Sequence, residues 1–307
     1  MIRLLCLLTL AIASLALAHA ADEPRRLRVV ATTTILADIT RQVGGDRITV
    51  HALLPPLAEV HGYEPTPADV TAIGGADVVV INGLGLEGWL ERLITQANAG
   101  GKIVTASERV EALVAESMCH DHAHGHGHAH GAPGSDPHAW LDARNGALYA
   151  EHIAEALAAA DAPGADDYRA WSAIYAAQLR LVDAWIRREI ATVPEAQRVL
   201  ITTHDSLRYF AHAYGLRVMP LRGTDAAHEP DAAALAALIG AVRTAGVRAA
   251  FLEGADGDRM VVQVAREAGI ALGGRLLTDA LAPPGEPGDS YLGLLLVNTR
   301  TVVRGLR

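Results

Sequence analysis

The sequence predicts an α/β protein of two lobes, each built on a parallel sheet flanked by helices, with one long helix between them. Short apolar runs alternate with helical patterns from residue 27 to residue 108, and the same alternation returns from residue 198 onward. A helical pattern of about 26 residues separates the two blocks. Because parallel strands need a crossover between them, this alternation indicates parallel sheets with helices on their faces.

The first block alternates strands and helices in a regular order. LRVVATT is strand-like and leads into ILADITRQVGG, whose apolar spacing is helical and whose paired glycines end the helix. ITVHALLP and DVVVING are typical of buried strands, and between them TPADVTAIGG is a helix begun by Thr66 with Asp69 in its first turn. LEGWLERLITQANAGG is a helix closed by glycines, and KIVTASE is a further strand.

Two helical stretches follow Trp140, namely NGALYAEHIAEALAAAD and DDYRAWSAIYAAQLRLVDAWIRREIATV. At 1.5 Å per residue the second would be roughly 39 Å long, enough to cross a whole domain. The second block then has the strands RVLITT, LRVMPLRG, VRAAFLEG and IALGGRLLT, which alternate with the helices SLRYFAHAYG, EPDAAALAALIGAVRTAG, DRMVVQVAREAG and a helix from Asp289 onward. We therefore predict a signal segment at 1–20, a first lobe at 21–165, a linking helix at 166–193 and a second lobe at 194–307.

The first 20 residues have a basic start, a short apolar core and the small-x-small sequence Ala18-His19-Ala20. The apolar run is shorter than the roughly 20 residues that span hydrocarbon, so we expect a signal peptide cleaved after Ala20 rather than an anchor. Cys6 lies inside this segment, and the mature chain keeps only Cys119, which excludes an intrachain disulfide. The signal segment and the single remaining cysteine fit a soluble periplasmic protein. The formal charge of −9 argues against a nucleic-acid partner, whose phosphates demand a basic face.

Four polar residues follow predicted strands, and in parallel sheets ligands collect beyond the carboxyl ends of the strands. They are His61, His138, His204 and Asp279. They are far apart in sequence and form no local ligand motif, and any one of them is more often a solvated or hydrogen-bonded side chain than a ligand. Their shared topological position, two in each lobe, suggests a metal site.

Five segments carry a resemblance to a known family. VHGYEPTPAD, INGLGLEGWL, SDPHAWLD, THDSLRYFAHAYGL and DSYLGLLLVNTRTVVRGL resemble, in this order, the corresponding segments of the solute-binding proteins of zinc and manganese ABC transporters. The resemblance covers nearly all of the mature chain. It implies two lobes joined by one rigid helix, with a metal in the cleft between them held by His61, His138, His204 and Asp279. It also implies delivery of the metal to a permease in the inner membrane, and we expect a monomer.

The third of these ligands bears on the metal. Manganese-type relatives place a carboxylate where this chain has His204. Three imidazoles and one carboxylate suit Zn²⁺, which favours nitrogen ligands in tetrahedral geometry. A catalytic zinc keeps one coordination position open, whereas four protein ligands only hold the ion, so we expect high-affinity capture and no enzyme activity. The segments around Asp279 and from Arg222 to Glu229 are candidates for a movement that releases the metal.

A histidine tract at 119–131 is a second candidate. Its alternating histidines are His120, His122, His124, His126, His128 and His130. So much glycine and alanine without a hydrophobic anchor predicts a mobile loop, yet imidazoles at adjustable spacing bind metal. We expect accessory zinc ligands of lower affinity, to which Cys119 could add a thiolate. Collecting scarce zinc, sensing its abundance and docking a metal-donating periplasmic chaperone are three open roles.

Several further residues have two open interpretations. A ligand imidazole usually donates its other N–H to a carboxylate or carbonyl, and four acidic residues lie near the candidate ligands in sequence. These are Asp136, Asp142, Asp205 and Glu64, for which a helix cap or an exposed turn is an equally good interpretation. His51, His152 and His212 are expected to be structural, and His228 is a weak candidate for an extra ligand.

Two other functions stay open at this point. A secreted zinc buffer or adhesin that feeds no transporter would differ only in lacking a permease partner. A secreted zinc hydrolase would need an open coordination position and a general base such as Glu59 or Glu64, and no hydrolase motif is present.

Overall fold

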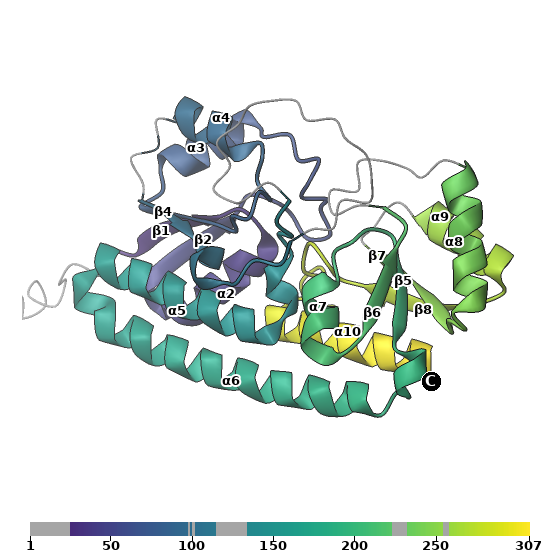
Figure 1. Ribbon diagram of the computed structural model, residues 1–307. Helices are drawn as coiled ribbons and strands as arrows, with labels where there is room; N and C mark the ends of the chain where they lie inside the picture. Colours follow the sequence, from purple (N-terminus) through teal and green to yellow (C-terminus); the bar gives the residue numbers. More distant parts are fainter. Residues whose placement is uncertain (1–24, 98, 100–101, 115–133, 223–231, 254–257) are drawn as a thin grey trace, which may run out of the picture.

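The computed structural model describes residues 25–97, 99, 102–114, 134–222, 232–253 and 258–307. Two four-stranded parallel sheets lie side by side in this part of the chain, above a layer of long helices (Figure 1). The predicted signal segment, the histidine tract with Cys119, and His228 all lie outside the described residues. Within the described ranges, no helix has both the length and the apolar character needed to cross a membrane.

The first sheet has the strand order β2-β1-β3-β4. Its strands are β1 (Leu27–Ala31), β2 (Ile48–Ala52), β3 (Val78–Ile81) and β4 (Lys102–Thr105). Its helices are α2 (Thr34–Gly44), α3 (Pro67–Gly74) and α4 (Leu90–Ala97). The capping box predicted for α3 is present: the Thr66 hydroxyl accepts the N–H of Asp69, and the Asp69 carboxylate accepts the N–H of Thr66.

Helix α4 begins at Leu90, four residues later than the sequence pattern predicts. The Glu87 carboxylate accepts the backbone N–H groups of Asn82 at 2.6 Å and Gly83 at 3.1 Å, and also the Thr32 hydroxyl at 2.8 Å. These bonds fold residues 82–87 into a turn at the end of β3. The apolar spacing of this stretch therefore belongs to a turn and not to a helix.

Two antiparallel helices underlie the molecule, α5 (Ala143–Ala160) and α6 (Ala165–Ala191). Figure 1 shows α6 extending beneath both sheets, as expected for a helix that joins two lobes. Asp142 caps α5 by accepting the N–H of Arg144, and two aspartates in the first turn of α6 favour its N-terminus electrostatically.

The second sheet repeats the topology of the first, with the order β6-β5-β7-β8. Its strands are β5 (Val199–Thr202), β6 (Arg217–Pro220), β7 (Ala249–Glu253) and β8 (Ala271–Leu276). Its helices are α7 (Arg208–Tyr214), α8 (Ala232–Thr244), α9 (Asp258–Ala268) and α10 (Tyr291–Leu306). The chain order reverses between β1 and β3 and again between β5 and β7, and ligands bind beyond the strand ends at such switch points.

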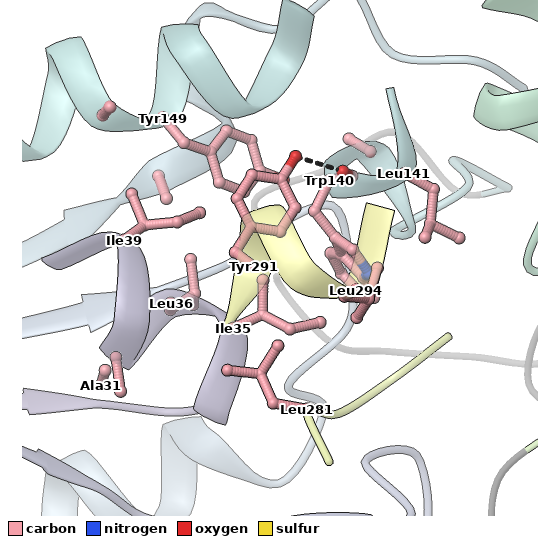
Figure 2. Close-up of a cluster of buried hydrophobic side chains, with 14 of the residues drawn as sticks. Ala31, Ile35, Leu36, Ile39, Trp140, Leu141, Tyr149, Leu281, Tyr291 and Leu294 are labelled. Atoms are coloured by element: carbon pink, nitrogen blue, oxygen red, sulfur yellow. Dashed lines mark hydrogen bonds between the residues drawn. The ribbon is translucent and has the colours of Figure 1, made fainter. Parts of the chain in front are cut away.

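Helix α10 follows the second sheet in sequence but buries side chains against the first lobe. Figure 2 shows Tyr291 and Leu294 of α10 packed with side chains of α2, α5 and the segment at Trp140. The backbone N–H of Tyr291 donates to the Asp38 carboxylate at 2.9 Å, and its hydroxyl donates to the Trp140 carbonyl at 2.5 Å. One buried cluster therefore spans both lobes, while a second cluster lies within the second lobe.

Candidate metal centre

The four predicted ligands come together between the lobes. His61 lies in the loop between β2 and α3, and His204 lies between β5 and α7. Asp279 lies between β8 and α10, while His138 precedes a short 3₁₀ helix instead of following a strand directly. One ligand atom of each residue lies within 4.8 Å of those of the other three. His61 is partly exposed, and the other three side chains are buried.

The spacing of the four side chains fits a small cation at their centre. The Nε2 atoms of His61 and His138 are 3.2 Å apart, and His138 Nε2 lies 3.4 Å from Asp279 Oδ1. His204 Nε2 lies 3.6 Å from Asp279 Oδ2. A tetrahedral zinc site with bonds of about 2.1 Å has neighbouring ligand atoms about 3.4 Å apart.

Two buried ligand atoms also make no well-aligned hydrogen bond among the described residues. They are His204 Nε2 and Asp279 Oδ1. Asp279 Oδ1 instead lies 3.4 Å from His138 Nε2, and His204 Nε2 lies 3.6 Å from Asp279 Oδ2, so a bound cation would replace these ion pairs with coordination bonds. The four residues therefore form a group that could hold a metal ion.

The charges of the metal-free centre balance one another. Burial lowers the pKa of His138, but hydrogen bonding to Asp136 and the proximity of Asp279 outweigh it and raise the pKa to about 9. Burial likewise lowers the pKa of His204, and the charges of Glu253 and Asp279 raise it well above its usual value. Burial raises the pKa of Asp279, yet the two imidazoles hold it well below its usual value. Both shifts favour the positively charged imidazolium form in the metal-free centre, so a metal that binds there must displace protons.

Each buried imidazole has a second carboxylate on its far side. Asp136 Oδ1 accepts the backbone N–H of His138 at 2.9 Å and lies 2.8 Å from its Nδ1. Glu253 Oε2 lies 3.1 Å from Nδ1 of His204. Such partners hold the ring so that the other nitrogen faces the metal. Asp136 was among the acidic residues noted from the sequence, whereas Glu253 was missed.

The other acidic residues noted from the sequence have other partners or are exposed. Asp142 caps α5 and pairs with Arg144 at 2.6 Å. Asp205 pairs with Arg208 three residues later, and Glu64 is exposed. The alternative interpretation therefore describes Asp142, a helix cap, and Glu64, an exposed loop residue, whereas Asp205 is a buried partner of Arg208.

The segment that carries Asp279 is held on both sides by the first lobe. The indole N–H of Trp140 donates to the Thr278 carbonyl at 2.7 Å, and the backbone N–H of Leu281 donates to the Thr34 hydroxyl at 2.9 Å. Residues 276–282 are all buried. These contacts oppose the expectation that the segment around Asp279 moves on release. The other candidate segment, 222–229, lies outside the described residues apart from its first residue.

The three histidines expected to be structural lie outside the cluster. His51 is exposed on β2 and His212 is exposed on α7. His152 on α5 contacts the Glu108 carboxylate at 3.0 Å.

Comparisons with known proteins match the chain along almost its whole length. Residues 29–305 match the family described as ZnuA, the periplasmic component A of a zinc-uptake complex. The manganese-binding lipoprotein MntA of Halalkalibacterium halodurans is 30% identical over 93% of this chain and 90% of its own. The iron ABC transporter substrate-binding lipoprotein MtsA of Streptococcus pyogenes is 29% identical over 92% of this chain and 89% of its own.

A solved structure confirms the fold. The periplasmic zinc-binding protein TroA of Treponema pallidum superimposes with a TM-score of 0.81 at 26% identity, covering 92% of this chain and 99% of that protein. Fold, chain coverage and family match agree with the resemblance carried by the five sequence segments. The chain belongs to the ZnuA family, the substrate-binding proteins of metal ABC transporters.

Proposed function

We propose that this protein captures Zn²⁺ with high affinity through His61, His138, His204 and Asp279 and delivers it to its cognate permease. The observation that carries the proposal is the donor set, because three imidazole nitrogens and one carboxylate favour zinc over manganese. Manganese prefers more oxygen ligands and a larger coordination number. Three separations among the ligand atoms, 3.2, 3.4 and 3.6 Å, are close to the value for a tetrahedral zinc site, and one ligand atom of each residue lies within 4.8 Å of the others.

Membership of the family sets the context for this proposal. The chain is a substrate-binding protein and not an enzyme. It binds a divalent metal as the transported ligand. Such proteins are exported and work with a membrane permease and an ATPase. Relatives are named for manganese or iron as well as zinc, so the identity of the metal is the point to test. We further propose a periplasmic monomer whose signal peptide is cleaved after Ala20.

The histidine tract enters the proposal as an accessory site. Binding that must order a glycine- and alanine-rich sequence is weaker than binding at a fixed site, so zinc bound by residues 119–131 is expected to exchange faster than zinc at the centre. Transfer from a periplasmic chaperone is one of the roles that the tract could serve.

The test is a titration of the mature protein, residues 21–307, with zinc and separately with manganese, by calorimetry and chelator competition. The same titrations are made on His204→Ala and on a variant that lacks residues 119–131. His212→Ala is the matched control, because His212 is an exposed histidine on the neighbouring helix α7. The proposal predicts one tight zinc site that survives the deletion and the control but is strongly weakened in His204→Ala.

Two outcomes would overturn it. Tighter binding of manganese than of zinc would reassign the metal. Loss of tight binding in the deletion variant, with His204→Ala unaffected, would move the high-affinity site to the tract.

A further inference from the structure

Glu253 is a buried carboxylate at the end of β7, and β7 is the strand next to β5 in the second sheet. Its side chain reaches across the end of the sheet to the turn that follows β5. Oε1 accepts the backbone N–H of Thr203 at 2.6 Å and that of His204 at 3.2 Å. Oε2 accepts the Ser206 hydroxyl at 2.6 Å and lies 3.1 Å from His204 Nδ1.

The two oxygens of Glu253 have different tasks. Oε1 faces two backbone N–H donors, so only an oxygen can occupy that position. Oε2 lies near Nδ1 of His204, whereas the other ring nitrogen, Nε2, is the one near Asp279. A carboxylate oxygen is an acceptor only, so it requires Nδ1 of His204 to carry a hydrogen. A neutral imidazole with a hydrogen on Nδ1 offers its lone pair on Nε2, the atom that lies 3.6 Å from Asp279 Oδ2.

We infer that Glu253 is a positioning residue for metal capture: it fixes His204 in the form that presents Nε2 to the metal. This inference rests on the proposed function, since it assigns a role to a partner of one proposed ligand. Glu253, at the end of β7, thereby determines which ring nitrogen of His204, in the loop after β5, binds the metal.

The closest isostere of glutamate makes the inference testable. In Glu253→Gln the amide oxygen must occupy the Oε1 position, because two backbone N–H groups point at it. The amide NH₂ then faces His204 Nδ1 and favours the form in which Nδ1 accepts and Nε2 carries the hydrogen. That hydrogen points at the metal position, so the substitution preserves the shape of the turn but opposes coordination.

The experiment compares zinc affinity, by chelator competition on the mature protein, across a set of variants. Glu253→Gln is expected to weaken zinc binding by about 10–100-fold, the range found for partners of metal-bound histidines. Ser206→Ala is the matched control, because it removes the second partner of Oε2 but leaves the carboxylate beside the ring. Its effect is expected to be much smaller.

A double-mutant cycle separates action through His204 from general damage to the turn. In a His204→Ala background, Glu253→Gln is expected to cause little further loss, since the ring on which Glu253 acts is absent. Nitrogen-15 NMR of histidine-labelled wild-type protein provides a readout that does not depend on any variant folding. Zinc-loaded protein is expected to show His204 with a hydrogen on Nδ1 and the metal on Nε2.

Three results would overturn the inference while leaving zinc capture intact: equal zinc affinity in Glu253→Gln and wild type, the same loss in both backgrounds, or coordination of His204 through Nδ1. Absence of tight zinc binding in the wild type would instead refute the proposed function, so the two failures are distinguishable.

Discussion

Two helical glycines are expected to respond oppositely to the same substitution. Gly146 lies in the first turns of α5, where a Cβ would come within 2.5 Å of Tyr291 Cε1 and 2.8 Å of Tyr291 Cζ. Gly240 lies in α8 with open space around the position that a Cβ would occupy. Replacing glycine by alanine in a helix interior stabilises the helix by about 1 kcal/mol in both cases, so any difference in sign comes from packing.

The expected change in the free energy of unfolding for Gly146→Ala depends on the packing and the hydrogen bond that Tyr291 would lose. The ring is fully buried, and its hydroxyl donates to the Trp140 carbonyl at 2.5 Å. Overpacking costs about 1–3 kcal/mol, and a buried carbonyl that loses its donor costs about 1–3 kcal/mol more. After subtracting the helix gain, Gly146→Ala is expected to reduce the free energy of unfolding by about 1–5 kcal/mol. Gly240→Ala is expected to raise it by about 0.5–1 kcal/mol.

The assay is urea unfolding of the metal-free protein, followed by far-ultraviolet circular dichroism and by tryptophan fluorescence. Coincidence of the two probes establishes whether a single free energy of unfolding describes the transition. Stabilisation by Gly146→Ala comparable to that by Gly240→Ala would refute the reasoning, because it would mean that Tyr291 moves aside without loss.

Three further predictions concern the centre and the helix near it. Because burial, which lowers the pKa of His138, is outweighed by Asp136 and Asp279 to give a pKa of about 9, zinc binding should release protons at pH 7.5. Calorimetry in buffers of different ionisation enthalpy should show this release declining as pH rises toward 9, and a buffer-independent enthalpy would contradict it. Asp136→Asn should weaken zinc binding by about 10–100-fold in chelator competition, with little change in far-ultraviolet circular dichroism. Thr66→Ala removes the hydroxyl that caps Asp69 N–H and should lower stability to urea by about 1 kcal/mol, and an unchanged midpoint would show that the cap is dispensable.

The alternation of strands and helices could be predicted from sequence because it depends on local patterns. Each segment contains its own signals: the period of its apolar residues, and the residues that begin or end its helix, such as Thr66 and the glycines. The same locality explains the error at α4, whose first residues have helical spacing but are drawn into a turn by Glu87. A side chain that bonds to backbone five residues earlier leaves no trace in hydrophobic periodicity.

The four candidate ligands were identified from topology and from the family resemblance, but their neighbours were harder to find. Asp136 precedes His138 by two residues, so the sequence placed it close by. Glu253 is 49 residues from His204 and reaches it only because β7 lies beside β5. Strand adjacency is set by tertiary packing, and nothing in the segment AAFLE distinguishes its carboxylate from an exposed one.

The packing of α10 against α2 has a consequence for when the protein can first hold an ion. The bond from the Tyr291 N–H to the Asp38 carboxylate joins positions 253 residues apart, and that from Leu281 to Thr34 joins positions 247 apart. Contacts of such separation carry a loop-closure cost that slows folding, and they need the C-terminal part of the chain to be present. A nascent chain that ends at β8 lacks the side chains that complete the first core. The protein is thus expected to complete its metal centre, and to select its metal, only in the compartment where the C-terminal helix joins the first core.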